Sequence, residues 1–434
     1  MQIPFSKRTL SNGLDVIVHE DHQLPMVAVN VWYHVGSKNE QPGRTGFAHL
    51  FEHLMFEGSE HHDRGYFPPL QRAGALLNGS TNADRTNYWE VVPTGALDLA
   101  LWMESDRMGY LLPALTDHKF NNQRDVVLNE RRQNYENRPY GLAGIALSAA
   151  MYPGSHPYNW PTIGSAEDLN AATIDLVREF FQSYYHPGNA SLSIAGDVET
   201  GQAFDLAERY FGELATGPKV ERVVASARLT ENATLVLEDR VELPRLYLSW
   251  HSPAMFEDDD AELDIVSDVL THGKTSRLFK TLVYERRVAT DVSAYQHSRE
   301  IGGVFQIACT AAAGIGLTEL HAAILSSIAD LAATGPTDDE LERGVSQTEA
   351  QFVYRVQTIG GFGGKGDQLN AYNTFVGDPG YFARDRERYL SVTRKGAAAA
   401  ATKWLVDAPM VSLSVVPRGK RELALSGAAE VSVS

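Results

Sequence analysis

The chain of 434 residues has a single cysteine, Cys309, and few basic residues for its length. One thiol excludes an intrachain disulfide framework and any metal site built from several cysteines. Lys and Arg number 38 against 55 Asp and Glu, which gives a net charge of −17. Because phosphate backbones bind basic surfaces, this charge argues against nucleic acid as a partner.

Long hydrophobic runs are also missing. The charge-free stretch at residues 301–318 contains four glycines, Gln306 and two threonines, which predicts a strand and a loop rather than a membrane span. The first residues, MQIPFSKRTLSNG, lack the apolar core of a signal peptide. We therefore expect no membrane partner and a cytoplasmic location, or a periplasmic one if a signal peptide has been removed and replaced by Met1.

The order of predicted elements repeats along the chain. MVAVNVWYHVGS in the first half and RLYLSWHSPAMF in the second each indicate a strand followed by a loop and a helix. FFQSYYHPGNASLSIAGDV and ATKWLVDAPMVSLSVVPRG each indicate a helix, a turn and a strand. This repetition favours a duplicated α+β unit of about 200 residues over a chance recurrence of a common element order. We expect a first domain at residues 1–215, a linker at 216–232 and a second domain at 233–434.

One segment, GFAHLFEHLMF at residues 46–56, combines an apolar helical stripe with ionisable side chains. His49 and His53 are four residues apart, so they project from neighbouring turns of one helix face, and Glu52 lies beside them. A catalytic zinc requires nitrogen ligands fixed by a helix and a carboxylate that accepts a proton from the attacking water. The alternative is a solvated helix face with two partly exposed histidines, which fits poorly with the continuous apolar stripe.

A catalytic zinc needs a third protein ligand. A helix predicted at residues 117–136 places Glu130 on the same side as Phe120 and Val127. The spacing alone does not favour Glu130 over Glu136.

The H-x-x-E-H pattern is the inverted zincin motif, and the segments around it resemble the pitrilysin family, which includes insulin-degrading enzyme and the mitochondrial processing peptidase. The resemblance is carried by LSNGLDVIVHED, GSKNEQPGRTGFAHLFEHLMFEGS, LNGSTNADRTNYWEVVP, NNQRDVVLNERRQ and YYHPGNASLSIAGDV, and more weakly by GKTSRLFKTLV in the second half. It implies an α+β fold of two homologous domains. Each would be a mainly antiparallel sheet packed with helices, and together they would form one half of a clam-shell chamber. The second domain would lack the zinc motif.

The resemblance also implies roles for individual residues. His49, His53 and Glu130 would bind one Zn²⁺ per chain, and Glu52 would be the general base. It selects Glu130 because the family's third ligand follows a V-V-L-x pattern, here Val126 to Asn129. Many members carry a Glu seven residues before that ligand, where this chain has Gln123, which we expect to hydrogen-bond a ligand without acting as a base.

The segment LLNGSTNADRTNYWEV resembles the family's edge strand that receives substrate. An extended peptide would add to this edge through backbone hydrogen bonds at Leu77, Asn78 and Gly79. Without the resemblance, the same residues indicate an ordinary strand.

The second half departs from the family. Active members carry an Arg and a Tyr, spaced R-x6-Y, that help hold substrate and stabilise the oxyanion, whereas this chain has Val283 and Thr290 at those positions. Losing one oxyanion donor costs about 100-fold or more in rate. We therefore expect a homologous partner subunit to supply the pair in a heterodimer, with a homodimer as the alternative. A weaker alternative is a neighbouring register that uses Arg286 or Arg287 with Tyr295.

Together these features predict a zinc metalloendopeptidase that hydrolyses short or unfolded peptides. Two alternatives remain: a non-catalytic scaffold or peptide-holding subunit of a peptidase complex, and a processing peptidase for one dedicated precursor.

Overall fold

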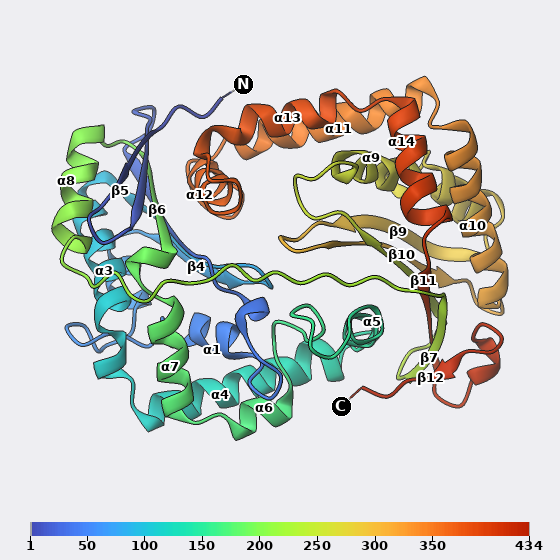
Figure 1. Ribbon diagram of the computed structural model, residues 1–434, viewed down its shortest axis with the longest axis horizontal. Helices are drawn as coiled ribbons and strands as arrows, with labels where there is room; N and C mark the ends of the chain where they lie inside the picture. The colour runs from blue at the N-terminus through green and yellow to red at the C-terminus, as the bar shows by residue number, and fades with distance from the viewer. Residues whose placement is uncertain (1, 434) are drawn as a thin grey trace. The chain divides into compact units, whose positions relative to one another are not determined.

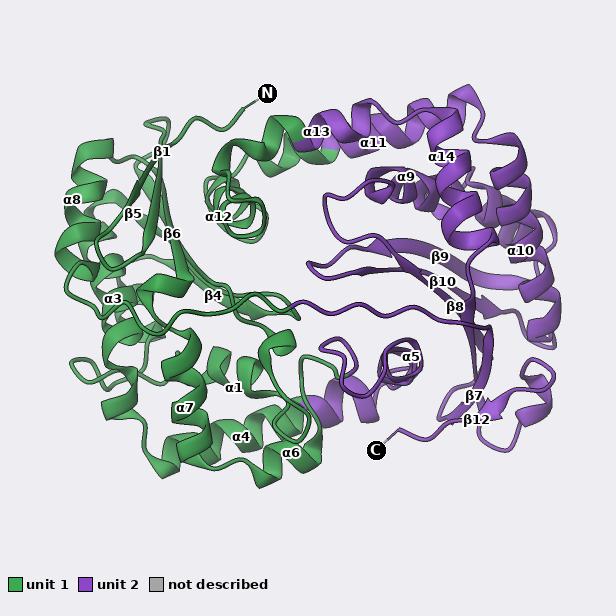
Figure 2. Cartoon of the chain, viewed as in Figure 1, with its two compact units in different colours: residues 1–130, 160–223, 351–384 green, residues 131–159, 224–350, 385–434 purple. Residues whose placement is uncertain are grey.

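The computed structural model describes residues 2–433 (Figure 1). The chain forms two compact units, and neither is continuous in sequence (Figure 2). Unit 1 contains residues 1–130, 160–223 and 351–384, and unit 2 contains 131–159, 224–350 and 385–434. This division differs from the expected boundaries at 215 and 233, because each half of the chain contributes one segment to the other unit.

Unit 1 is built on a six-stranded sheet with the order β1-β2-β6-β3-β5-β4. β2 and β6 are parallel, and the other neighbouring strands are antiparallel. The strands are β1 (Ser6–Thr9), β2 (Asp15–Glu20), β3 (Met26–Tyr33), β4 (Leu76–Thr81), β5 (Thr86–Pro93) and β6 (Ala190–Gly196).

Unit 2 has a six-stranded sheet with the order β12-β7-β11-β8-β10-β9. Its strands are β7 (Ala233–Asp239), β8 (Arg245–Ser252), β9 (Ala289–His297), β10 (Gly303–Ala311), β11 (Met410–Pro417) and β12 (Ala429–Glu430). β7 and β11 are parallel, and β11, β8, β10 and β9 are antiparallel in turn. Five strands therefore repeat the order and directions of unit 1, which confirms the predicted duplication of an α+β unit.

Helices cover both faces of each sheet. In unit 1, α1, α3, α7 and α8 pack on one face, and α12 lies on the other (Figure 1). The helices of this unit are α1 (Phe47–Leu54), α2 (Phe67–Arg72), α3 (Leu97–Ala114), α4 (Asp117–Arg131), α6 (Ala166–Ala171), α7 (Ile174–Tyr184), α8 (Thr200–Phe211) and α12 (Lys365–Val376). Unit 2 contains α5 (Ala143–Met151), α9 (Asp260–Thr271), α10 (Leu317–Thr334) and α14 (Arg394–Ala401). Unit boundaries fall within α11 (Asp338–Arg355) and α13 (Phe382–Leu390) and before the last residue of α4.

The alternation along β3 explains why both faces of the unit 1 sheet are covered. Val29 and Val31 are fully buried on the α1 face, and Asn30 and Trp32 are buried on the other face, beneath α12. Trp32 Nε1 donates to the Asp367 carboxylate of α12 (2.8 Å). No helix among the described residues is long and apolar enough to cross a membrane.

Candidate metal centre

Helix α1 carries the H-x-x-E-H motif and is held at its N-terminus by Glu40. The backbone N–H groups of Gly46 (2.9 Å) and Ala48 (2.8 Å) donate to the Glu40 carboxylate. Burial raises the pKa of Glu40 to about 8, against the effect of these hydrogen bonds. Gly46 adopts the left-handed conformation (φ 89°), which favours glycine. Motif reasoning missed Glu40, although an acidic residue shortly before a helix is a recognisable capping signal.

Three side chains, two from α1 and one from α4, lie close together. The ligand atoms of His49, His53 and Glu130 all lie within 4.8 Å of one another. The Glu130 Oε2 atom is 3.7 Å from His49 Nε2 and 3.4 Å from His53 Nε2. Zinc bonds of 2.0–2.1 Å in a tetrahedron separate neighbouring ligand atoms by about 3.4 Å. The structure thus brings together the three residues predicted as ligands, at separations that suit this metal.

The chemistry of the donor set also fits zinc. Burial and the neighbouring His53 lower the pKa of His49 to about 3, so this imidazole is neutral at pH 7, the form that binds metal. Its Nδ1 atom is buried and has no hydrogen-bond partner within residues 2–433. Glu136, the alternative third ligand, is 3.3 Å from Arg131 in an ion pair. The geometry therefore selects Glu130, where spacing left the choice open.

Glu52 lies on α1 between the two histidines in sequence. Burial raises the pKa of its carboxyl, whereas the Thr81 hydroxyl, His53 and Arg85 oppose this rise. Thr81 is the last residue of β4, so the free end strand of the sheet and the Glu52 carboxylate meet at this point. Thr81 was not predicted from the motif, because its position depends on the packing of α1 against β4.

Gln123 lies two helical turns before Glu130 on α4. Its side-chain amide donates to the Glu57 carboxylate, on the loop after α1. A hydrogen bond from Gln123 to a metal ligand stays a prediction.

The predicted substrate residues lie on β4, which is the end strand of the unit 1 sheet within the described chain. Leu77 and Gly79 share a face with their partners on β5, Glu90 and Tyr88. Gly79 N donates to the side chain of Asn78 (2.8 Å), so this amide of the strand already has a local partner. The edge position that the sequence suggested is thus present.

The departures in the second half lie in unit 2. Val283 packs against the apolar core of this unit, and Thr290 Oγ1 donates to Asp291 (3.2 Å). Neither side chain can donate the hydrogen bonds with which the family's Arg and Tyr hold substrate and stabilise the oxyanion. Arg286 forms an ion pair with Glu319 (2.5 Å), and Tyr295 is half exposed on β9.

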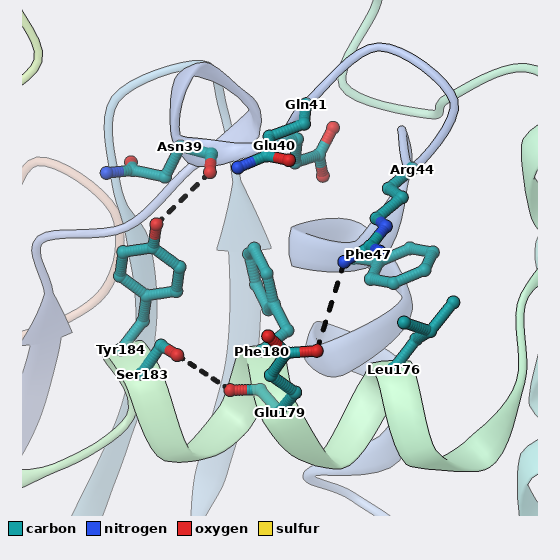
Figure 3. Close-up of a pocket in the computed structure, with 10 residues that line it drawn as sticks. All are labelled: Asn39, Glu40, Gln41, Arg44, Phe47, Leu176, Glu179, Phe180, Ser183 and Tyr184. Carbon is teal, nitrogen blue, oxygen red and sulfur yellow. Dashed lines mark hydrogen bonds and ion pairs between the residues drawn. The ribbon is translucent and has the colours of Figure 1, made fainter.

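Two other features of unit 1 are distinct from this centre. A small pocket of about 110 Å³ lies between α7 and the loop before α1, near Phe180 and Tyr184, and none of the three convergent residues lines it (Figure 3). The side chains of Glu20, His22 and Glu199 also lie close together, but all three are exposed, and His22 Nδ1 is hydrogen-bonded to Asp197 (2.7 Å).

Two protein-family models match the chain. The model described as Insulinase (Peptidase family M16) matches residues 15–159, and the model described as Peptidase M16 inactive domain matches residues 171–348. Together they cover most of the sequence, and the first contains every residue of the metal centre.

Individual relatives agree with these models. A zinc protease, PqqE, of Helicobacter pylori is 29% identical over 358 residues, which cover 81% of this chain and 80% of the relative. An uncharacterized zinc protease, YmxG, of Bacillus subtilis is 26% identical over 351 residues, with 81% and 84% covered. The crystal structure of a protease from Helicobacter pylori matches with a TM-score of 0.88 and 25% identity, over 95% of this chain and all of the other. The chain is therefore similar in sequence and in fold to proteins named as proteases.

Proposed function

Because the chain belongs to peptidase family M16, the pitrilysin family, we propose that it is a zinc metalloendopeptidase that hydrolyses short or unfolded peptides. The convergence of His49, His53 and Glu130 beside Glu52 carries this proposal. A scaffold subunit has no need for three ligands at these separations with a carboxylate beside them.

Each residue has a defined task in this reaction. His49 Nε2, His53 Nε2 and a Glu130 carboxylate oxygen would hold the metal. When bound, zinc supplies a Lewis acid that polarises the scissile carbonyl and makes water nucleophilic at neutral pH. The Glu52 carboxylate accepts a proton from the attacking water and returns it to the leaving amine nitrogen.

The free edge of β4 supports binding of an extended peptide. A peptide strand would pair with those backbone groups of Leu77, Asn78 and Gly79 that point away from β5, and the side chain of Asn78 would release the Gly79 amide. Backbone pairing gives affinity with little dependence on sequence, which suits a peptidase with broad substrates.

The presence of Val283 and Thr290 at the positions of the family's Arg and Tyr supports a second part of the proposal, which concerns the assembly. A homologous partner subunit supplies the Arg and Tyr that this chain lacks, so the active assembly is a heterodimer. Two alternatives predict other results. A peptide-holding scaffold would contain no stoichiometric zinc, and a processing peptidase would cleave one precursor rather than many peptides.

The test is hydrolysis of a mixed set of unstructured peptides by the zinc-loaded chain, with products identified by mass spectrometry. Glu52→Gln is compared with Glu60→Gln, an exposed carboxylate on the loop after α1. We expect Glu52→Gln to keep its zinc and lose activity by about 100-fold or more, and Glu60→Gln to match the wild type.

The outcomes separate the alternatives. Cleavage by the chain alone would show that no partner is needed, and cleavage that appears only with an added homologous subunit would support the heterodimer. Cleavage of one precursor among many peptides would favour a processing peptidase. A chain without stoichiometric zinc would be a scaffold and would contradict the proposal.

A further inference from the structure

A second pocket in unit 1 lies beside the first residue of β4. It has a volume of about 560 Å³, the range of small-ligand sites. Its apolar wall is formed by Leu24, Met26, Leu76, Val91, Val356 and Ile359. Two of these side chains, Leu24 (67%) and Leu76 (68%), are unusually exposed for leucines at the edge of a cavity. Exposed aliphatic surface gathered around a hollow indicates a binding site.

The pocket is formed by well-fixed parts of the fold. A Cβ atom at Gly360 would lie 2.5 Å from Val91 and 2.6 Å from Ala28, so the loop at residues 356–360 rests directly on the sheet. The backbone of this loop is also bonded to the first turn of α12, through Lys365 N to Thr358 O (2.9 Å). One wall is therefore preformed rather than flexible.

The interior of the pocket suits an uncharged guest. Its two charged lining residues, Lys365 and Asp21, form an ion pair with each other (2.6 Å). A charged side chain in the pocket would have to compete with this pair, whereas an aliphatic or aromatic one would bury its surface against the leucines.

The strand register relates the pocket to the metal centre. Leu76 is directly opposite Val91, so both side chains face the α12 side of the sheet, while Thr81, at the other end of β4, lies by Glu52. Thr81 is five positions after Leu76 on β4, a distance of about 17 Å along the strand. An added peptide in the favoured antiparallel direction runs from Thr81 toward Leu76, and its residue opposite Leu76 shares that face.

We propose that this pocket selects an aliphatic or aromatic side chain about five residues C-terminal to the scissile bond of the peptide. The proposal rests on the peptidase function proposed above and adds a specificity determinant to it. Peptides too short to reach Leu76 lose this contribution.

The test uses binding, so that it does not depend on turnover or on a partner subunit. Peptides that begin with a zinc-chelating hydroxamate fix the register at the metal centre, and a single Leu is moved along an otherwise Ser and Asn sequence. Dissociation constants are measured by fluorescence anisotropy for the zinc-loaded wild type, the Leu24→Ser/Leu76→Ser variant and the control Val224→Ser. Val224 is an exposed aliphatic residue outside the pocket (92% exposed).

We expect the wild type and Val224→Ser to bind most tightly when Leu is about five residues from the chelating group, and about tenfold more weakly when Ser replaces it. The double variant should bind the Leu and Ser peptides within about twofold of each other. Zinc-dependent binding with no positional preference for Leu would overturn this inference and leave the metal centre intact. Binding that is equal in the wild type and in Glu130→Gln would overturn the metal centre, and the proposed function with it.

Discussion

Helices α1 and α9 follow corresponding central strands, β3 in unit 1 and β8 in unit 2, and yet they carry opposite chemistry. On α1 the side chains four residues apart are His49 and His53, which face Glu130. On α9 the repeating side chains are carboxylates: Asp260, Asp264 and Asp268. Imidazoles at this spacing suit a zinc site, whereas carboxylates that are buried, as Asp260 is, or partly buried, as Asp264 and Asp268 are, need cations or protons.

Unit 2 satisfies its carboxylates from its own C-terminal segment. Arg388 donates to Asp260 (2.9 Å), and the Tyr389 hydroxyl donates to Asp264 (2.7 Å). Within residues 2–433, no group of three or more His, Cys, Asp or Glu residues of unit 2 has ligand atoms as close together as those of the metal centre. The same scaffold thus carries a candidate metal centre in one unit and a network of carboxylates with their own hydrogen-bond partners in the other, and a few side chains make this difference.

The largest expected effect that distinguishes α1 from α9 is the loss of metal when the histidines of α1 are replaced. His49→Ala/His53→Ala removes both nitrogen ligands, so we expect the chain to lose stoichiometric zinc after dialysis against a weak chelator. Inductively coupled plasma mass spectrometry measures the zinc per chain. The control His22→Ala, in the exposed cluster, should keep the wild-type content, and retention of zinc by the double variant would contradict the site.

A smaller effect is expected from breaking the ion pair on α9. Arg388→Met leaves the buried Asp260 carboxylate without its cation, and we expect unit 2 to lose about 3 kcal/mol of unfolding free energy. Urea denaturation monitored by circular dichroism measures the change. Arg384→Met is the control, because Arg384 is exposed on the same helix and its pair with Asp378 contributes little. Equal effects of the two variants would show that the α9 carboxylates need no cation.

The smallest effect concerns pH. Burial, together with the neighbouring Asp260 and Asp268, raises the pKa of Asp264 to about 7 against the opposing effects of the Tyr389 hydrogen bond and Arg388. The folded state therefore holds a proton that the unfolded state releases near pH 4, so this group's contribution to stability falls as pH rises toward 7.

Asp264→Asn removes this titration and keeps an acceptor for Tyr389. We expect its stability, relative to the wild type, to improve by about 2 kcal/mol between pH 5 and pH 8. Urea midpoints across this range measure the difference. An unchanged pH slope in the variant would place the titration elsewhere in the molecule.

Local patterns in the sequence predicted much of the fold. The alternation in β3 and the apolar stripe of α1 follow from period-two and helical spacing, and the repeated element order predicted the duplicated sheet. The exchange of residues 131–159 and 351–384 between the units was not predicted, because it depends on contacts between distant parts of the chain.

The residues of the candidate site likewise fall into those that local spacing predicted and those that it did not. Spacing placed His49, Glu52 and His53 together, since they share one helix. Choosing Glu130 required either the family resemblance or the structure, because its helix is far away in sequence. The contact of Gln123 with Glu57 arises from tertiary packing, which no local pattern encodes, whereas Glu40 lies only six residues before Gly46 and offered a local capping signal.

The central claim is that zinc binds at α1 and not at α9. X-ray absorption at the zinc edge, on the chain loaded with one equivalent of zinc, tests it most directly. The account predicts nitrogen and oxygen neighbours at about 2.0–2.2 Å with scattering from two imidazole rings. A shell of oxygen atoms without imidazole scattering would place the metal on carboxylates alone and contradict the account.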